Sequence, residues 1–158
     1  SPQDLVPLEK IPAPKLRTKI LAWSIPAIII GMMIYGCFCS GKDMSFEMMK
    51  TWAIATGVCA GLGAASALAH PITIVSAVLA APFTALHPFL AAGMVSGLVE
   101  AILRRPLVAD LESIAEDMTT VRGLWRNRLS KILLIVAFTN IGGTIGIFLG
   151  GFGVASYL

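Results

Sequence analysis

Charged residues are scarce in this chain, and their absence from long stretches excludes most soluble classes of protein. Lys, Arg, Asp and Glu make up 13% of the 158 residues, against about 25% in ordinary soluble domains. No charge occurs in residues 20–41, 51–99 or 132–158. Because about 20 apolar residues cross the hydrocarbon core of a bilayer, each tract can hold a span. The composition predicts an integral membrane protein, and its spans should be helices because lipid cannot satisfy backbone polar groups.

Side chains for catalysis or metal binding are also few. Cys37, Cys39 and Cys59 are an odd number of cysteines in apolar tracts, which excludes a full disulfide framework and favours small membrane-buried thiols. The two histidines, His70 and His87, fall short of a zinc site. Lysines and arginines do not cluster on a polar face, so nucleic acid is not an expected partner. We expect no metal, no cofactor and no catalytic residue in this chain.

Prolines and short polar segments divide the chain into predicted elements. Residues 1–16 hold four prolines and are expected to form an extended linker from a missing upstream soluble domain. The absence of an initiating Met agrees with a fragment or a processed product. Residues 17–158 are predicted to form the transmembrane domain. Its helices are expected at 17–40, kinked at Pro26, and at 45–69, 71–81, 88–103, 106–122 and 129–153.

The stretch HPITIVSAVLAAPFTALHPF (70–89) is apolar but interrupted by proline. Because proline favours the first position of a helix, both His-Pro pairs are predicted to start helices, with His70 and His87 at or near the cap. The first of these helices, 71–81, would rise about 16 Å, roughly half the hydrocarbon thickness. Together with 88–103 it would form a re-entrant pair of half-helices. The alternative is one deep, kinked span.

Positive charge favours the re-entrant pair. Lys15, Arg17 and Lys19 precede the first helix, so the positive-inside rule puts the N-terminus in the cytoplasm. A pair that dips in and returns keeps the five arginines of residues 104–128 on that side, whereas one span would place them outside. The predicted fold is therefore all-α integral membrane and multi-pass. It has three full transmembrane helices, the re-entrant pair and an amphipathic linker helix.

The segment 106–122 is the predicted amphipathic linker helix. Its apolar residues follow the 4-3-4-3 spacing of one stripe, while acidic residues occupy the other faces. Adsorption to anionic lipid favours a Lys/Arg-rich face instead. We expect this helix to pack on the membrane domain or on a partner subunit. The stripe consists of Leu107, Leu111, Ile114, Met118 and Val121.

Small residues mark faces where helices could approach closely. Glycines four residues apart occur in the second helix, and the last helix carries a double GxxxG pattern within FTNIGGTIGIFLGGFG. Such stripes favour close helix contact, and they support tight packing better than they support dimerisation. The predicted packing glycines are Gly57, Gly61, Gly93, Gly97, Gly142, Gly146 and Gly150.

Four polar residues are candidates for a pore or ligand site: Thr84, His87, Asn140 and Glu100. The half-helix hypothesis places Thr84 and His87 near mid-membrane, at a helix N-terminus of the kind that transporters use to hold ions or substrates. The simpler alternative is that His87 caps its own helix and Thr84 satisfies the loop backbone. Asn140 is expected to bond across helices. Glu100 is expected to pair with Arg104 at i,i+4, the alternative being a proton-carrying carboxylate.

Several strings of this sequence resemble the C-terminal membrane region of TraB/PrgY-type proteins, which are named for pheromone shutdown. They are ALAHPITIVSAVLAAPFTALHPFLAAGMVSGLVEA, RRPLVADLE, GLWRNRL and ILLIVAFTNIGGTIG. The resemblance covers about residues 60–150. It implies an upstream soluble TraB domain related to the Tiki group of proposed metalloproteases. The glutamate and histidine motifs of that group do not occur in this chain, so no catalysis is expected from it.

The resemblance and the glycine stripes together give the first functional hypothesis. The chain would anchor a soluble TraB domain at the membrane and oligomerise it, with a homodimer favoured and the bilayer and that domain as partners. The alternative is a channel or transporter for an ion or small solute at the broken helix. A third hypothesis, from family analogy alone, is an intramembrane binding module for a hydrophobic peptide such as a pheromone.

Overall fold

A computed structural model describes residues 15–87 and 90–158, and within these ranges the regular structure is helical throughout. The predicted all-α class is therefore confirmed. Most of the predicted extended linker, 1–16, lies outside the described residues. The helices are α1 (Leu16–Ser40), α2 (Lys42–Ser66), α3 (Pro71–Ala85), α4 (Ala92–Arg104), α5 (Val108–Glu112), α6 (Ile114–Asp117), α7 (Val121–Arg126) and α8 (Arg128–Ala155).

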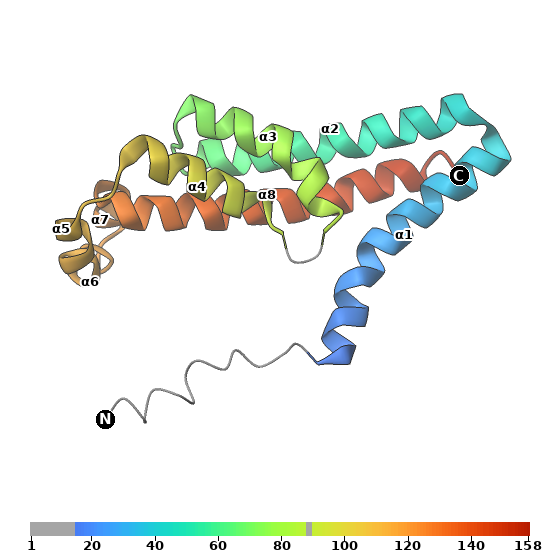
Figure 1. The fold of residues 1–158 in the computed structure, drawn as a ribbon. Coiled ribbons are helices and arrows are strands. Elements are labelled where there is room, and N and C mark those ends of the chain that lie inside the picture. The colour runs from blue at the N-terminus through green and yellow to red at the C-terminus, as the bar shows by residue number, and fades with distance from the viewer. Residues whose placement is uncertain (1–14, 88–89) are drawn as a thin grey trace.

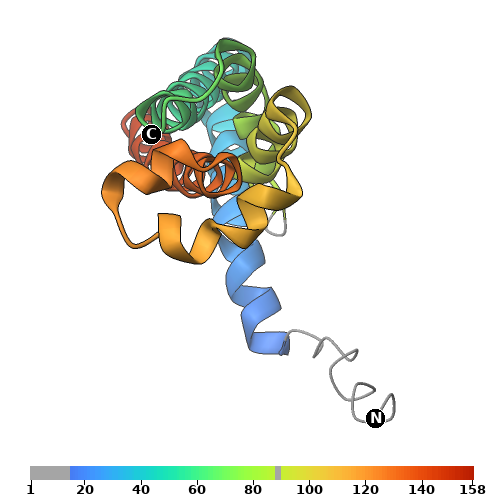
Figure 2. The same ribbon diagram turned by 90° about the vertical axis from the view of Figure 1, so that its left-hand side faces the viewer.

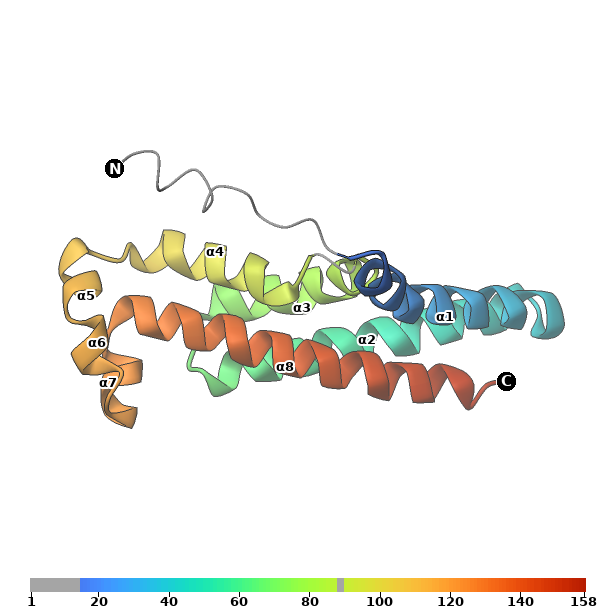
Figure 3. The same ribbon diagram turned by 90° about the horizontal axis from the view of Figure 1, so that it is seen from below.

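The antiparallel pair α2 and α8 forms the centre of the fold (Figure 3). The two helices approach so closely because glycines of one face the backbone of the other. A Cβ built on Gly146 would lie 2.7 Å from the Cα of Thr56, and one on Gly150 would lie 2.9 Å from the Trp52 side chain. Gly142 likewise faces the carbonyl oxygen of Cys59. Without side chains at these positions, the backbones can come into contact.

The other predicted packing glycines also lie within interfaces of this chain. Gly57 and Gly61 of α2 face Val78 of α3, and Gly93 and Gly97 of α4 face Val136 of α8. The prediction of tight helix packing is confirmed at all seven positions. These contacts are intramolecular, so the glycine faces are already covered by helices of the same chain.

Helices α3 and α4 form an antiparallel hairpin in which α3 packs on α2 and α4 packs on the first half of α8 (Figures 1 and 3). The chain turns back near the middle of the α2–α8 pair, as a re-entrant pair requires, and one continuous kinked helix does not form. The predicted break at Pro82 is wrong, because α3 continues to Ala85. Proline deprives the Val78 carbonyl of its i+4 donor, and that oxygen instead faces Gly57, 2.8 Å from a Cβ built there.

Helix α1 packs beside the other half of the pair, and its N-terminal half diverges from the bundle (Figure 1). Pro26 lies inside the helix without ending it, as predicted. The second helix was predicted to start at residue 45, but only Gly41 separates α1 from α2, and its φ of +89° is a conformation that glycine adopts without strain. Cys37 and Cys39 lie exposed on α1 rather than buried in the protein.

Two of the helices, α1 and α8, are long and apolar enough to cross a membrane. The prediction of three full spans is thus supported for two. Helix α2 is as long as α1, at 25 residues, but it is not among the helices apolar enough to cross, so the third predicted span is not supported. It contacts neighbours along most of its length, and the buried residues at these contacts include the small residues Gly57, Ala60, Gly61 and Ala64.

The linker does not form the single helix predicted for 106–122. It folds into α5, α6 and α7, three short helices at one end of the bundle (Figure 2). Helix α5 ends at Glu112, and the hydroxyl of the next residue, Ser113, donates to Asp117. A second break precedes α7, where the Thr120 side chain accepts a hydrogen bond from the Gly123 N–H. A Thr side chain that bonds a nearby backbone N–H favours a helix start at that point, so at Thr120 local capping overrides the apolar periodicity.

Candidate functional site

A cavity of about 300 Å³ lies at the tip of the hairpin, lined by residues from α1, α2, α3, α4 and α8. Thr84, His87 and Asn140 all line it. The structure therefore brings three of the four candidate residues together, although they are up to 56 positions apart in the sequence. Their use in binding stays a prediction.

Asn140 holds the start of α4 from a neighbouring helix. Its Oδ1 accepts a hydrogen bond from the backbone N–H of Gly93, 2.8 Å away. Helix α4 begins at Ala92 without a side-chain cap of its own, so Asn140 of α8 fulfils the role of a cap in three dimensions. This bond across helices confirms the expectation for Asn140.

The predicted capping role of His87 is wrong, because α4 begins five residues later, at Ala92. The His87 ring instead contacts Trp23 of α1 edge-on, with ring centroids 5.7 Å apart. His70, by contrast, is the N-cap of α3 as predicted, and its Nδ1 accepts a hydrogen bond from the N–H of Ile72. Thr84 donates to the carbonyls of Ala80 and Ala81 in its own helix.

Glu100 lies away from the cavity and joins α4 to the start of α3. Its side chain is fully buried and accepts hydrogen bonds from the Thr73 hydroxyl at 2.5 Å and the His70 N–H at 3.1 Å. Its other oxygen pairs with Arg104, which confirms the i,i+4 expectation. A buried carboxylate needs such donors, and the arrangement fits a structural joint between the outer ends of the hairpin helices.

Two contacts between buried polar side chains could not be found from sequence patterns. Thr73 lies 27 residues before Glu100, and only the hairpin brings them together. Ser96 donates to Thr139 across the α4–α8 interface, where both residues are completely buried. Single hydroxyls in an apolar tract carried no signal that would distinguish them from their neighbours.

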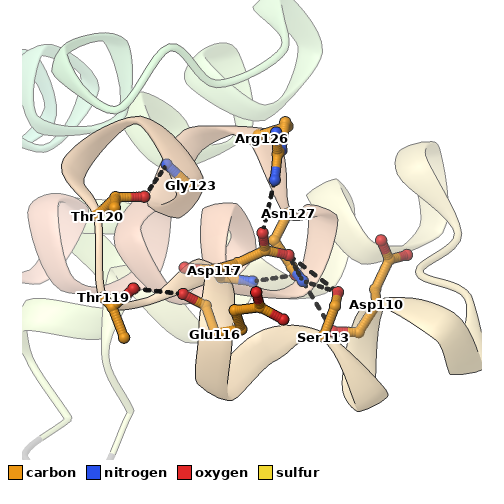
Figure 4. Close-up of polar contacts among 10 residues, drawn as sticks. Asp110, Ser113, Glu116, Asp117, Thr119, Thr120, Gly123, Arg126 and Asn127 are labelled. Atoms are coloured by element: carbon orange, nitrogen blue, oxygen red, sulfur yellow. Dashed lines mark hydrogen bonds and ion pairs between the residues drawn. The ribbon is translucent and has the colours of Figure 1, made fainter.

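A second polar cluster joins the linker to α8, and Asn127 is its centre (Figure 4). The Asn127 Oδ1 accepts from the N–H groups of Leu129 and Ser130, which caps α8. Its Nδ2 lies within hydrogen-bond distance of the Asp110 carbonyl, the Ser113 hydroxyl and Asp117 Oδ2. Asn127 therefore fixes the linker against the start of the longest helix.

Asp117 completes this cluster. Hydrogen bonds from Asn127, Arg126 and Ser113 hold the pKa of the Asp117 carboxyl below its usual range. The Arg126 guanidinium lies 2.9 Å from Asp117 Oδ1. Among the described residues, no group of three or more His, Cys, Asp or Glu side chains is arranged to hold a metal ion.

Comparison with protein families identifies residues 17–158 as matching the model for the C-terminal domain of TraB family proteins. This chain belongs to the TraB family. It is also 33% identical over 150 residues to an uncharacterised protein of Methanocaldococcus jannaschii. The aligned part covers 92% of this chain but only 38% of that relative. No solved structure matches the chain.

Proposed function

We propose that this TraB C-terminal domain is a non-catalytic, multi-pass membrane anchor for a soluble TraB domain that precedes it. The observation that carries the proposal is the outward-facing apolar surface of its longest helices. In the apolar 18-residue stretch of α1 only 17% of the residues are buried within the chain, and in that of α8 only 33% are buried. A bilayer would cover that surface. The share of the relative beyond this chain leaves room for such a domain.

The anchor is tested by joining a soluble fluorescent reporter upstream of residue 1. The reporter is expected to stay in the membrane pellet after an alkaline carbonate wash. Ile28→Lys with Ile145→Lys, on the exposed apolar faces of α1 and α8, should increase the share of the reporter that the wash extracts, because a charge at mid-membrane costs about 2.5–3.5 kcal/mol by insertion scales. The matched control is Leu111→Lys with Val121→Lys in the linker, which should leave it bound. Extraction of the unmodified fusion by carbonate would refute the proposal.

Homodimerisation belongs to the same proposal, but the glycine stripes are used within the chain and cannot carry it. One exposed apolar surface that could carry it is the face of α1 that holds Ile34 and Phe38, one turn apart and 53% and 87% exposed. Double substitution of these two residues by alanine should lower energy transfer between labelled copies in lipid vesicles. Leu79→Ala on α3, also exposed, is the control. Equal energy transfer in all three proteins would argue against this interface.

Transport of an ion or small solute is the second candidate function, and the cavity at the hairpin tip favours it. Half-helices that meet within a membrane place backbone groups where a solute can reach them. Flux into sealed liposomes that falls in His87→Ala and Asn140→Ala would support it. Liposomes that stay equally impermeable with the unmodified chain and with both variants would exclude this function. The narrower PrgY-type relation and a pheromone-like peptide ligand rest on family resemblance alone.

A further inference from the structure

The cavity at the hairpin tip presents hydrogen-bond donors that the described protein atoms leave unused. The backbone N–H groups of Ala91 and Ala92, at the start of α4, have no hydrogen-bond partner among the described residues. Both residues line the cavity. The Asn140 Oδ1 accepts a hydrogen bond from the Gly93 N–H, and the NH₂ group of the same amide remains available to donate. These donors come from two helices, and their residues line the same cavity.

The same cavity also presents acceptors. Three threonine hydroxyls on its wall, those of Thr56, Thr84 and Thr144, give their hydrogens to backbone carbonyls of their own helices. Each hydroxyl oxygen therefore keeps lone pairs for a further hydrogen bond. Pro26 of α1 has no N–H, so the Ala22 carbonyl four residues before it lacks its usual helical donor and is a further acceptor. Both residues line the cavity.

No lysine, arginine, aspartate or glutamate occurs among the described residues that line the cavity. Apart from His87, an ion would meet no ionisable side chain on the described wall, and burying an unpaired charge is costly. Most of the remaining lining residues are apolar, as is usual for small-molecule sites. A volume of about 300 Å³ is at the lower end of the range for such sites.

We propose that this cavity is a binding site for a small uncharged solute that both accepts and donates hydrogen bonds, of the amide or polyol class. The Ala91 and Ala92 N–H groups and the Asn140 amide hold its oxygen, and the threonine hydroxyls accept from its N–H or O–H groups. The site goes beyond membrane anchoring, and it would be the solute site if the transport candidate is correct.

Helix α1 closes one side of this site. Ala22, Ile25 and Pro26 line the cavity, and Trp23 contacts His87 next to the hairpin tip. The N-terminal half of α1 otherwise diverges from the bundle (Figure 1). The Trp23–His87 contact therefore holds α1 against a residue of the cavity wall, and removing it is expected to widen access to the cavity.

The test uses the full chain in lipid nanodiscs with Cys37, Cys39 and Cys59 replaced by alanine and Thr84→Cys introduced. N-ethylmaleimide is the uncharged probe, and a sulfonated methanethiosulfonate is the anionic one. Thr84→Cys should react readily with the uncharged reagent, while the charged reagent should be slowed about a hundredfold relative to its rate at Ser113→Cys in the linker. Ser96→Cys, completely buried in the α4–α8 interface, should react with neither. Trp23→Ala should speed labelling by the uncharged reagent.

Binding itself is read from protection. Acetamide should slow the labelling of Thr84→Cys, whereas sodium acetate at the same concentration should not. Adding Asn140→Asp, which keeps an oxygen for the Gly93 N–H but removes the amide NH₂ donors, should abolish protection while labelling without acetamide persists. Fast labelling by the charged reagent would overturn the proposal by showing an open aqueous path. Inertness to both reagents, or no protection by acetamide, would overturn it as well. Retention in carbonate-washed membranes tests the anchor separately, so failure of one does not imply failure of the other.

Discussion

The two glycines Gly146 and Gly151 of α8 allow the same substitution to be compared in a helix contact and outside one. Gly146 faces α2, and a Cβ built there would lie 2.7 Å from the Cα of Thr56 and 2.8 Å from the carbonyl oxygen of Ala55. These are backbone atoms, so no side-chain rotation can relieve the contact. At Gly151 a new Cβ would meet no atom within 4 Å.

The expected effects have opposite signs. Gly146→Ala forces α2 and α8 apart, and overpacking of this kind costs about 1–3 kcal/mol. Gly151→Ala gains helix propensity of about 0.5–1 kcal/mol. For a chain of this length, 1 kcal/mol corresponds to about 2–4 °C in Tm. Gly146→Ala should therefore lower the Tm by several degrees, while Gly151→Ala raises it by about 2 °C.

The assay is thermal unfolding in detergent, followed by circular dichroism, with light scattering on the same samples to give the oligomeric state. A shift of the same sign and size in both variants would refute the account of the α2–α8 contact. A Gly146→Ala protein that keeps its Tm but loses a dimer would place this glycine face between copies of the chain instead.

Three further results follow from the polar contacts. Asn127→Ala should destabilise the protein by about 1–2 kcal/mol in the same unfolding assay because it removes the cap of α8. Asn127→Ser keeps a capping oxygen without placing a second carboxylate beside Asp117 and should cost less, and the reverse order would contradict the capping role. Thr73→Val leaves the Glu100 carboxylate with one hydrogen-bond donor fewer and should lower the Tm. Glu100→Gln in the Thr73→Val background should recover part of this loss in Tm. An unchanged Tm in Thr73→Val would show that the contact between Thr73 and Glu100 does not stabilise the fold. Folding lowers the pKa of Asp117, so the stabilisation that this carboxylate contributes is complete above the unfolded pKa of about 3.9 and is lost as the pH falls through the folded pKa. Asp117→Asn should therefore lower the Tm at neutral pH and make the Tm less dependent on pH in acid. An unchanged pH dependence of the Tm would argue against this role of Asp117.

Local signals in the sequence predicted the elements that proline and apolar tracts define. Pro71 and His70 mark the start of α3, and the tract from residue 132 marks most of α8. The end of α3 was not predictable in the same way. Pro82 reads as a break, but α3 continues past it to Ala85 while Val78 packs against Gly57 of α2. Tertiary contact decides that boundary, and a single sequence does not reveal it.

The candidate site was predictable in part for a similar reason. Polar residues in an apolar tract stand out, so Thr84, His87 and Asn140 could be singled out before their common cavity was known. Glu100 stood out equally, yet it belongs to a separate cluster. Asn127 lay in a polar linker where asparagine is unremarkable, and its contacts with residues up to 17 positions away depend on how the short helices fold.

The central claim is that α3 and α4 enter the membrane and return to the same side. It is tested most directly by labelling single cysteines from each face of sealed vesicles of known orientation. Thr18→Cys and Ser113→Cys, on a background without the native cysteines, should react from the cytoplasmic face. Ser156→Cys, after α8, should react from the opposite face. Labelling of Ser113→Cys from the face opposite to Thr18→Cys would mean that the hairpin segment crosses the membrane, and would contradict the account.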